Sequence, residues 1–480
     1  MNRRMVFYMV GQIIKLEAAV LLLPALVALL YGEACLWAIL ATAGVALACG
    51  FALTLISRPS TQVIFAREGF VIVALSWLAL SAIGALPFFF SREIPDYIDA
   101  FFETVSGFST TGASILPDVE ALSRGLLFWR SFTHWIGGMG VLVLIMAIVP
   151  SVSGRNMHIL RAEMPGPVVG KLMPRIRDTA KILYIIYLAL TAAEILLLLV
   201  GGMPLFDSVV HAFGTAGTGG FGIKADSIGG YSPYLQWVIS IFMLLFGVNF
   251  NLYYLILIRH AKTALKSREL WIYIAIVLGA TTAIACNIAP LYGEFEETVR
   301  TSLFQVAAII TTTGYATADF NLWPSLSKGI LLVLMFVGGC AGSTAGGLKI
   351  SRVQLLINTV RRDLRRLLHP RSVGVIKMEG KRLDEASIAG TSAYFILYII
   401  LLAVGSLLLS LEPFGMVTNF SAMITCINNV GPGFDLVGPA GNYSIYSPLS
   451  TLLLSFVMLF GRLEIYPMLF MLIPSTWTKK

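Results

Sequence analysis

The sequence predicts an all-α protein that crosses a membrane many times. Of its 480 residues, 57% are hydrophobic and only 12% are charged, and the mean hydropathy is +0.83. Soluble globular proteins carry roughly 25% charged residues, so about half of the usual charge is missing. Apolar stretches of about 20 residues, the length that crosses the hydrocarbon core, recur along the whole chain. These observations together predict a polytopic membrane protein.

Ten membrane spans are predicted, near 12–31, 35–56, 69–90, 127–150, 182–202, 235–258, 270–290, 327–348, 386–410 and 449–474. The basic N-terminus, Met1–Arg4, leads directly into the first apolar run. Lys15 and Glu17 interrupt that run and no convincing cleavage site follows, which favours a retained membrane helix over a signal peptide. The five cysteines form no C-x-x-C pair, so neither a disulfide framework nor a metal site is expected.

The basic residues gather in a few connecting segments. They are Arg155, Arg161, Lys171, Arg175, Arg177 and Lys181, then Arg259, Lys262, Lys266 and Arg268, then Lys349, Arg352, Arg361, Arg362, Arg365, Arg366, Arg371, Lys377, Lys381 and Arg382. The connections expected on the opposite side carry Glu93, Asp96 and Asp99, or Glu294, Glu296 and Glu297. This asymmetry follows the positive-inside rule and predicts cytoplasmic N- and C-termini. It explains the net charge of +8 without a nucleic-acid partner.

Four short apolar segments recur between the spans, at 99–112, 207–220, 301–314 and 418–431. Each begins with a predicted helix cap and ends 13 positions later in glycine; the caps are Asp99, Asp207, Thr301 and Thr418, and the glycines are Gly112, Gly220, Gly314 and Gly431. The apolar stretch between them reaches only about halfway across a bilayer. The pattern predicts four helix–pore-loop–helix repeats, although glycines that merely let helices pack closely are the alternative.

A short helix followed by a returning loop can stabilise a cation at the membrane centre. A half-membrane helix points its negative C-terminal end at the membrane centre, and glycine lets the returning chain expose its carbonyl oxygens. Four such loops around one axis can replace the hydration shell of an ion. The final four positions of each segment carry no acidic residue, which favours a monovalent ion over calcium. The predicted ion-coordinating residues are Thr110, Thr111, Gly112, Thr218, Gly219, Gly220, Thr312, Thr313, Gly314, Asn428, Asn429, Val430 and Gly431.

The predicted organisation has five parts: a two-helix extension at 1–60, and pore repeats at 61–152, 153–262, 263–370 and 371–480. The second span of the third repeat is broken by a run of small residues, namely Gly338, Gly339, Ala341, Gly342, Ser343, Thr344, Ala345, Gly346 and Gly347, with Cys340 among them. Each glycine inside a helix costs about 1 kcal/mol, so a straight helix is not expected there. A phosphate-binding P-loop is rejected, because Leu348 stands where its lysine should be.

Two charged residues, Arg462 and Glu464, lie within the last apolar span. Charges at membrane depth are costly and mark candidate functional sites. A cation below the pore loops would repel permeant cations, whereas a salt bridge between these two residues is the alternative. Lys349 is expected to extend to the membrane interface, and His211 to be a packed, hydrogen-bonded residue. No nucleophile–base pair or metal cluster suggests an enzyme.

The runs GGCAGSTAGGLK at 338–349, NNVGPG at 428–433 and FGRLEI at 460–465 are the most specific parts of the chain. Through them the chain resembles the Trk/Ktr/HKT superfamily of potassium transporters, most closely the bacterial Trk potassium-uptake membrane subunits. The resemblance covers essentially the whole chain. It implies that Gly112, Gly220, Gly314 and Gly431 form a selectivity filter, and glycine rather than serine at position 112 implies potassium selectivity.

The same resemblance implies that the small-residue run is an intramembrane gate and that Arg462 is the pore arginine. It further implies a homodimer with one pore per subunit in a bacterial or archaeal cytoplasmic membrane. A cytoplasmic subunit that binds NAD or ATP would regulate it, and the basic connection 349–382 is the expected docking surface. Potassium is the permeant ion, and no cofactor is expected in this chain. A secondary potassium symporter coupled to protons or sodium is the alternative, because such proteins also have broken helices and repeats.

Overall fold

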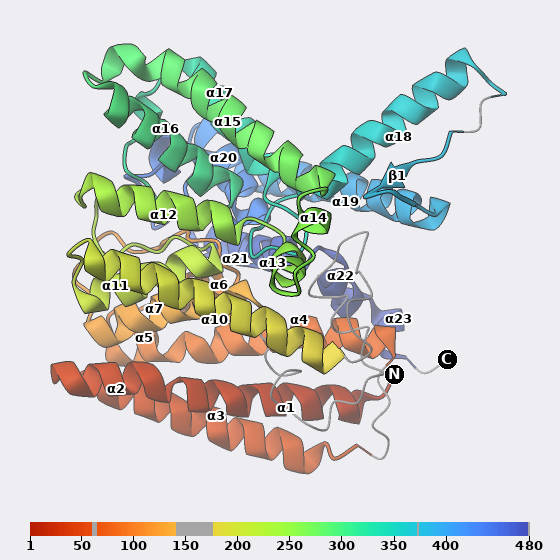
Figure 1. Ribbon diagram of the computed structural model, residues 1–480. Coiled ribbons are helices and arrows are strands. Elements are labelled where there is room, and N and C mark those ends of the chain that lie inside the picture. The colour runs from red at the N-terminus through yellow and green to blue at the C-terminus, as the bar shows by residue number, and fades with distance from the viewer. Residues whose placement is uncertain (60–64, 141–175, 372–373, 479–480) are drawn as a thin grey trace.

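The computed structural model describes residues 1–59, 65–140, 176–371 and 374–478, and nearly all of its regular structure is helical (Figure 1). The first half contains α1 (Arg3–Val20), α2 (Leu22–Tyr31), α3 (Leu36–Ile56), α4 (Ala66–Gly84), α5 (Leu86–Ser91), α6 (Tyr97–Phe108), α7 (Arg124–Gly138), α10 (Ile176–Val200), α11 (Leu205–Gly217), α12 (Pro233–Phe246), α13 (Phe250–Leu257) and α14 (Ala261–Ala264). The second half contains α15 (Arg268–Ile288), α16 (Phe295–Ile310), α17 (Ser325–Val337), α18 (Ile350–Leu368), β1 (Lys377–Met378), β2 (Lys381–Arg382), α19 (Glu385–Leu409), α20 (Met416–Asn428), α21 (Pro448–Arg462), α22 (Tyr466–Leu472) and α23 (Pro474–Trp477).

Six stretches in the described residues are long and apolar enough to cross a membrane. They are Arg3–Tyr31, Leu36–Ile56, Arg67–Ser91, Ala180–Val200, Arg268–Leu291 and Glu385–Leu409. Each matches one predicted span to within a few residues, except that the first begins nine positions before its predicted start at residue 12. The first two form the N-terminal layer, in which α1 packs along α3.

The other predicted spans are shorter or bent, and here the sequence interpretation is partly wrong. The predicted span 235–258 is two helices, α12 and α13, that meet at an angle of 89°. The predicted span 449–474 ends at Arg462, and α22 begins only at Tyr466. The break at Gly247–Asn249 is stabilised by the Asn249 side chain, which accepts a hydrogen bond from the Asn251 N–H and caps α13. The end of the fourth predicted span, 141–150, lies outside the described residues.

Four half-length helices, α6, α11, α16 and α20, correspond to the predicted pore-loop segments, but the predicted caps are wrong. Asp99, Asp207 and Thr418 are each the third residue of their helix, and Thr301 lies further inside α16. The cap of α6 is Asp96, whose carboxylate accepts hydrogen bonds from the N–H groups of Ile98 and Asp99. Asp207 accepts a hydrogen bond from the Tyr231 hydroxyl at 2.9 Å, and the Thr418 hydroxyl donates to the Asp435 carboxylate at 2.6 Å. Asp207 and Thr418 therefore tie α11 and α20 to the loops that follow them.

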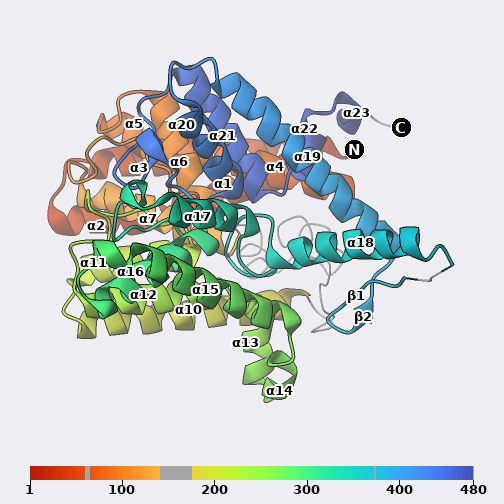
Figure 2. The ribbon, with the colours of Figure 1, turned by 90° about the horizontal axis from the view of Figure 1, so that it is seen from above.

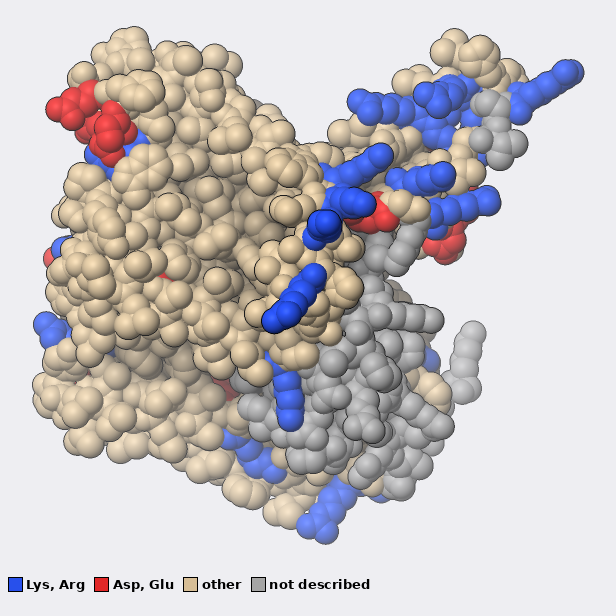
Figure 3. Space-filling model, in the orientation of Figure 1, with Lys and Arg blue, Asp and Glu red and all other residues tan. Residues whose placement is uncertain are grey.

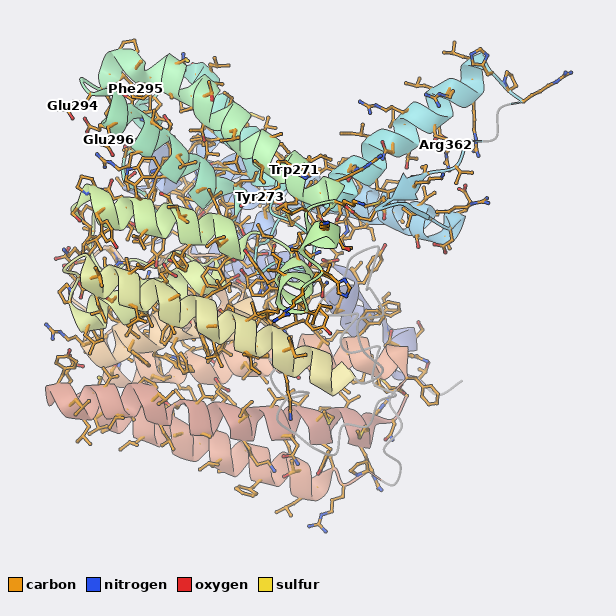
Figure 4. All side chains as sticks on the ribbon, viewed as in Figure 1. Trp271, Tyr273, Glu294, Phe295, Glu296 and Arg362 are labelled. Carbon is orange, nitrogen blue, oxygen red and sulfur yellow. The ribbon has the colours of Figure 1, made fainter. Side chains whose placement is uncertain are left out.

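The two ends of the molecule differ in charge. Lys and Arg cover the end that holds α18 and both chain termini, here called the basic end (Figures 1 and 3). Glu294 and Glu296 lie at the opposite, acidic end, far from Arg362 on α18 (Figure 4). Seen from above, α18 extends away from the helical body at the basic end (Figure 2). Of the basic residues in the first predicted group, Arg155, Arg161, Lys171 and Arg175 lie outside the described residues, as does the C-terminal Lys479–Lys480 pair.

Candidate ion pathway

The four half-length helices end in the same backbone conformation. Their chains turn left-handed at Thr110, Thr218, Thr312 and Asn429, where φ is 55°, 55°, 56° and 56°. The N–H of the next residue donates back to a carbonyl oxygen five positions earlier at 2.8–2.9 Å in all four copies, from Thr111 to Ser106, from Gly219 to Gly214, from Thr313 to Ala308 and from Val430 to Thr425. This is the Schellman arrangement that closes a helix end. A non-glycine residue rarely adopts positive φ, so four equivalent instances indicate one repeated structure.

The residues that follow form a closed ring. We call 110–112, 218–220, 312–314 and 429–431 the ring segments. The glycine that ends each segment has a φ between 71° and 97°, and its open side faces a backbone oxygen of the next segment. Gly112 faces the Gly219 oxygen, Gly220 faces Thr313, Gly314 faces Val430, and Gly431 faces Thr111. A Cβ atom at any of the four would come within 3.0 Å of that oxygen. The order closes on itself, so the four segments surround a common axis.

A cavity of about 160 Å³ opens on the acidic-end side of the ring, and all four ring glycines line it. Arg130 of α7 also lines this cavity, and its charge is paired with Glu103 of α6 at 2.5 Å. The same guanidinium donates to the Gly222 oxygen at 2.8 Å and lies 3.5 Å from the centre of the Phe221 ring. The Glu103 carboxylate in turn accepts from the Ile115 N–H at 2.8 Å. This buried ion pair therefore braces the chains that leave the first two ring segments.

The loop between α17 and α18, residues 338–349, covers the other side of the ring, and we call it the glycine loop. The Gly346 N–H donates to the Thr312 hydroxyl at 2.6 Å, and the Gly347 N–H donates to the Asn428 oxygen at 3.0 Å. The loop also fills the break between α12 and α13, because the Cys340 N–H donates to the Gly247 oxygen at 3.0 Å. The glycine loop thus lies directly against the ring segment 312–314 and against the end of α20, just before the ring segment 429–431, on the basic-end side.

Arg462 fixes the glycine loop from a third direction. Its guanidinium donates to the Thr344 oxygen at 3.0 Å, to the Gly137 oxygen at 2.5 Å and to the Gly138 oxygen at 2.9 Å. A cavity of about 70 Å³ lies beside it, lined by the glycine loop, the end of α7 and Arg462. One side chain from the last repeat therefore connects the loop to α7 on the basic-end side of the ring.

Two expectations for nearby charges are wrong. Lys349 does not extend to the interface: it is only 9% exposed, and its ammonium donates to the Ala345 oxygen inside the loop. Its backbone has a φ of 73°, so the chain turns sharply there before α18 begins. The proposed partner of Arg462, Glu464, forms its ion pair with Arg352 of α18. Both positive charges, Lys349 and Arg462, consequently line the small cavity under the ring.

All of the predicted coordinating residues except Asn428 lie in the ring segments. Asn428 is the last residue of α20, and its side chain exchanges hydrogen bonds with the Tyr398 hydroxyl away from the ring. The Asn429 amide instead links neighbouring segments, because it donates to the Thr111 hydroxyl at 2.9 Å and to the Met458 oxygen at 3.0 Å. Among the described residues no group of three His, Cys, Asp or Glu side chains could hold a metal ion.

His134 is a residue of this region that the sequence interpretation missed. Its Nδ1 lies 2.8 Å from the Gly107 oxygen, and its ring packs 4.2 Å from the Phe221 ring. A Cβ atom on Gly219 would collide with the imidazole, so His134 requires the glycine there. His211 is packed and hydrogen-bonded as expected, with Nδ1 2.8 Å from the Asp207 oxygen. The histidines lack metal-ligand spacing, and only their position inside apolar helices could have indicated a buried role.

Comparisons with known proteins show the family of the chain. A family model described as TrkH, cation transport protein, matches residues 38–277 and 293–479. The chain belongs to this family. It is 37% identical to the Trk system potassium uptake protein TrkH of Salmonella typhimurium, over 99% of this chain and 100% of that one. It is 33% identical to TrkG of Escherichia coli, over 99% and 98%. The crystal structure of the potassium transporter TrkH from Vibrio parahaemolyticus matches with a TM-score of 0.90, at 34% identity and full coverage of both chains.

Proposed function

We propose that this TrkH-family chain conducts potassium ions across the cytoplasmic membrane of a bacterial or archaeal cell. The relatives at 37% and 33% identity are potassium uptake proteins, and they align over nearly the full chain. The basic end, which carries both termini, faces the cytoplasm in this proposal, because Lys and Arg accumulate on the cytoplasmic side of membrane proteins. Potassium then enters from the acidic end.

The observation that carries this proposal is the closed ring of four glycines. Each ring segment contributes backbone oxygens next to a glycine, and the C-terminal ends of α6, α11, α16 and α20 direct their negative dipoles toward the same place. Backbone oxygens around one axis can replace the water around a dehydrated cation. In our proposal the ring is the selectivity filter, and Gly112 gives it a preference for potassium.

The glycine loop and Arg462 form the gate in this proposal. The loop bonds to Thr312 and Asn428 at the basic-end side of the ring, where an ion leaving the filter has to pass. A guanidinium at the same depth adds a positive charge that repels potassium, and its hydrogen bond to Thr344 keeps the loop in place. In this proposal the pore is closed while these contacts hold, and it opens when the loop moves aside.

The partners belong to the same proposal. A cytoplasmic nucleotide-binding subunit docks on the basic surface at 349–382, where α18 carries Arg361, Arg362, Arg365 and Arg366. The chain forms a homodimer with one pore per subunit. Co-purification of the full-length chain with a nucleotide-binding subunit, and its mass in detergent, test these two statements; a monomer that binds no such subunit would contradict them.

A flux assay tests the central proposal. Liposomes loaded with potassium and containing the purified chain should take up tracer rubidium as potassium leaks out, and deletion of residues 341–346 should increase this uptake. A chain that gives no flux even after the deletion would refute the permeation proposal. A deletion that leaves the flux unchanged would refute the gate and leave the filter standing.

Coupled transport is the second candidate function, and two buried carboxyls favour it more than the sequence suggested. Glu17 of α1 and Glu194 of α10 are buried in membrane-spanning helices, and the Glu17 oxygens have no hydrogen-bond partner among the described residues. A symporter needs titratable groups at membrane depth, which these residues provide. Neither residue lines the cavities beside the ring. At fixed potassium, a reversal potential that shifts with pH or sodium would favour the symporter, and one that follows potassium alone would favour the channel.

A further inference from the structure

Glu269 is a buried carboxylate in the first turn of α15, and neither the filter nor the gate described above requires it. The residue is 8% exposed, and its Oε1 accepts a hydrogen bond from the Ala341 N–H at 2.7 Å. The N–H of Ser351 also faces this carboxylate. Ala341 lies near the start of the glycine loop, and Ser351 lies just after its end. One carboxylate from outside the loop therefore bonds to the loop near its start and faces the first turn of α18, just after the loop ends.

The position of the loop and the charge of Glu269 depend on each other. A buried carboxylate is costly unless hydrogen bonds compensate for the lost water. The N–H groups at the ends of the loop provide this compensation, and the N-terminal end of α15 adds a favourable dipole. If the loop moves away from the ring, Glu269 loses the contacts that stabilise its charge. The carboxylate consequently opposes any displacement of the loop.

The hairpin of β1 and β2 supports Glu269 from the basic end. Glu379 lies in the turn of this hairpin, and its Oε1 accepts from the Ser267 hydroxyl at 3.2 Å and from the Glu269 N–H at 3.1 Å. Ser267 is the N-cap of α15. The next turn of α15 contacts α12 instead of the hairpin, since the Tyr273 hydroxyl donates to the Leu244 oxygen at 3.1 Å. Trp271 and Tyr273 are labelled on this part of α15, and β1 lies beside α18 (Figures 1 and 4).

A continuous path therefore runs from an exposed hairpin to the loop under the ring. Glu379 accepts from the first turn of α15, that turn carries Glu269, and Glu269 bonds to the loop at Ala341. We propose that Glu269 is the anchor that keeps the glycine loop against the ring, and that the β1–β2 hairpin controls this anchor through Glu379. Glu269 is a positioning residue that acts through the loop. A role of this anchor in regulation rests on the proposed gate. The effect of Glu269 on the position of the loop does not depend on that proposal.

Cys340 provides a readout of loop position that does not depend on ion flux. Its thiol is buried in the glycine loop, so a water-soluble maleimide should label it slowly in the purified full-length chain. In the Glu269→Ala variant we expect the labelling rate, measured by peptide mass spectrometry, to rise roughly 10- to 100-fold, because hydrogen bonds to a charged group are lost. Glu269→Gln keeps the shape and can still accept a hydrogen bond, so its rate should lie in between. Glu379→Ala should give a smaller rise than Glu269→Ala.

Two controls make the result specific. Glu385→Ala removes a carboxylate of the basic end that pairs with Arg362 and has no contact with α15 among the described interactions, so the Cys340 rate should stay at the wild-type value. Cys426, buried in α20 behind the fourth ring segment, should remain unlabelled in every variant. The anchor is refuted if Cys340 stays protected in Glu269→Ala and Glu269→Gln, or if Cys426 becomes reactive together with it.

The outcomes also separate the anchor from the gate. If Glu269→Ala exposes Cys340 but Glu379→Ala does not, the anchor stands and the role of the hairpin is refuted. If Cys340 becomes reactive and rubidium uptake stays at the wild-type level, the loop has moved without opening a pore. In that case the anchor stands and the gate proposal fails. Increased labelling and increased uptake in the same variants support both.

Discussion

The Gly112→Ser variant tests the ring at its first position. Gly112 has a φ of 79°. A Cβ atom at this position would lie 2.0 Å from the Gly219 oxygen, whereas Cβ atoms in real proteins essentially never come closer than 3.0 Å, so the two atoms would have to separate by about 1 Å. Because that oxygen belongs to the neighbouring ring segment, the strain acts on the geometry of the proposed filter. A serine side chain at positive φ also costs about 1–2 kcal/mol in backbone energy.

We expect the variant to fold and to lose selectivity. The chain already tolerates non-glycine residues at positive φ two positions earlier, at Thr110 and its three equivalents. A displaced oxygen coordinates a dehydrated potassium ion less well, whereas a smaller or partly hydrated sodium ion depends less on it. If the displaced oxygen weakens the binding of potassium by about 1.4 kcal/mol relative to that of sodium, the potassium-to-sodium permeability ratio falls roughly tenfold.

The assay is the potassium-to-sodium permeability ratio from reversal potentials in reconstituted bilayers. Gly431→Ser is the matched control, because a Cβ atom there would lie 2.7 Å from the Thr111 oxygen and needs a much smaller adjustment. The ratio should therefore fall further for Gly112→Ser than for Gly431→Ser. An unchanged ratio in Gly112→Ser, or the opposite order of the two variants, would refute the assignment of the ring as the filter.

Three further predictions concern the surroundings of the ring. Arg462→Ala should raise rubidium uptake by roughly tenfold or more, because several charge-assisted hydrogen bonds that hold the loop are lost; a decrease at normal expression would contradict this. Arg130→Met should lower the free energy of unfolding by about 3–5 kcal/mol, since it leaves Glu103 buried without its partner. Thermal unfolding in detergent checks this, and the Glu103→Gln, Arg130→Met double variant should recover most of the loss. Asn429→Ala should cost about 1–3 kcal/mol of stability by the same measurement, because the link to Thr111 is removed; wild-type stability would argue against that link.

The parts of the fold that depend on length and apolarity could be predicted from the sequence. A helix such as Glu385–Leu409 crosses the hydrocarbon core on its own, so its hydropathy determines its place. The break between α12 and α13 could not be predicted this way, because Gly247 and Asn249 lie inside an apolar run that is long enough to cross the membrane as one helix. What stabilises the break is distant in the sequence: the Gly247 oxygen is bonded by the N–H of Cys340 in the glycine loop. Interruptions of this kind depend on tertiary hydrogen bonds.

In the candidate site, too, features that depend on the local sequence could be predicted, whereas features that depend on tertiary contacts could not. The four terminal glycines could be found because positive φ and close approach to a neighbouring segment leave room for no other residue. The helix starts could not be placed from Asp99 or Thr418, since a polar residue three positions inside a helix resembles a cap in sequence. The direction of the Lys349 side chain could not be predicted either. A lysine after an apolar run usually extends to the interface, but the sharp turn at its own φ of 73° directs this one back into the loop.

The ring is nearly fourfold symmetric, but the structure beneath it is not, and this difference has a physical consequence. Among the described second helices, the breaks after α12 and α21 each span three residues, 247–249 and 463–465, whereas the break after α17 spans 338–349. Among these three breaks, the longer segment bonds to Thr312 of one ring segment and to Asn428, the residue before another. A channel of four identical chains would need four loops and four arginines around the same axis, which would crowd one another. If the proposed gate is right, a single loop and a single Arg462 close the pore because the four ring segments lie in one chain, and a single carboxylate, Glu269, anchors that loop.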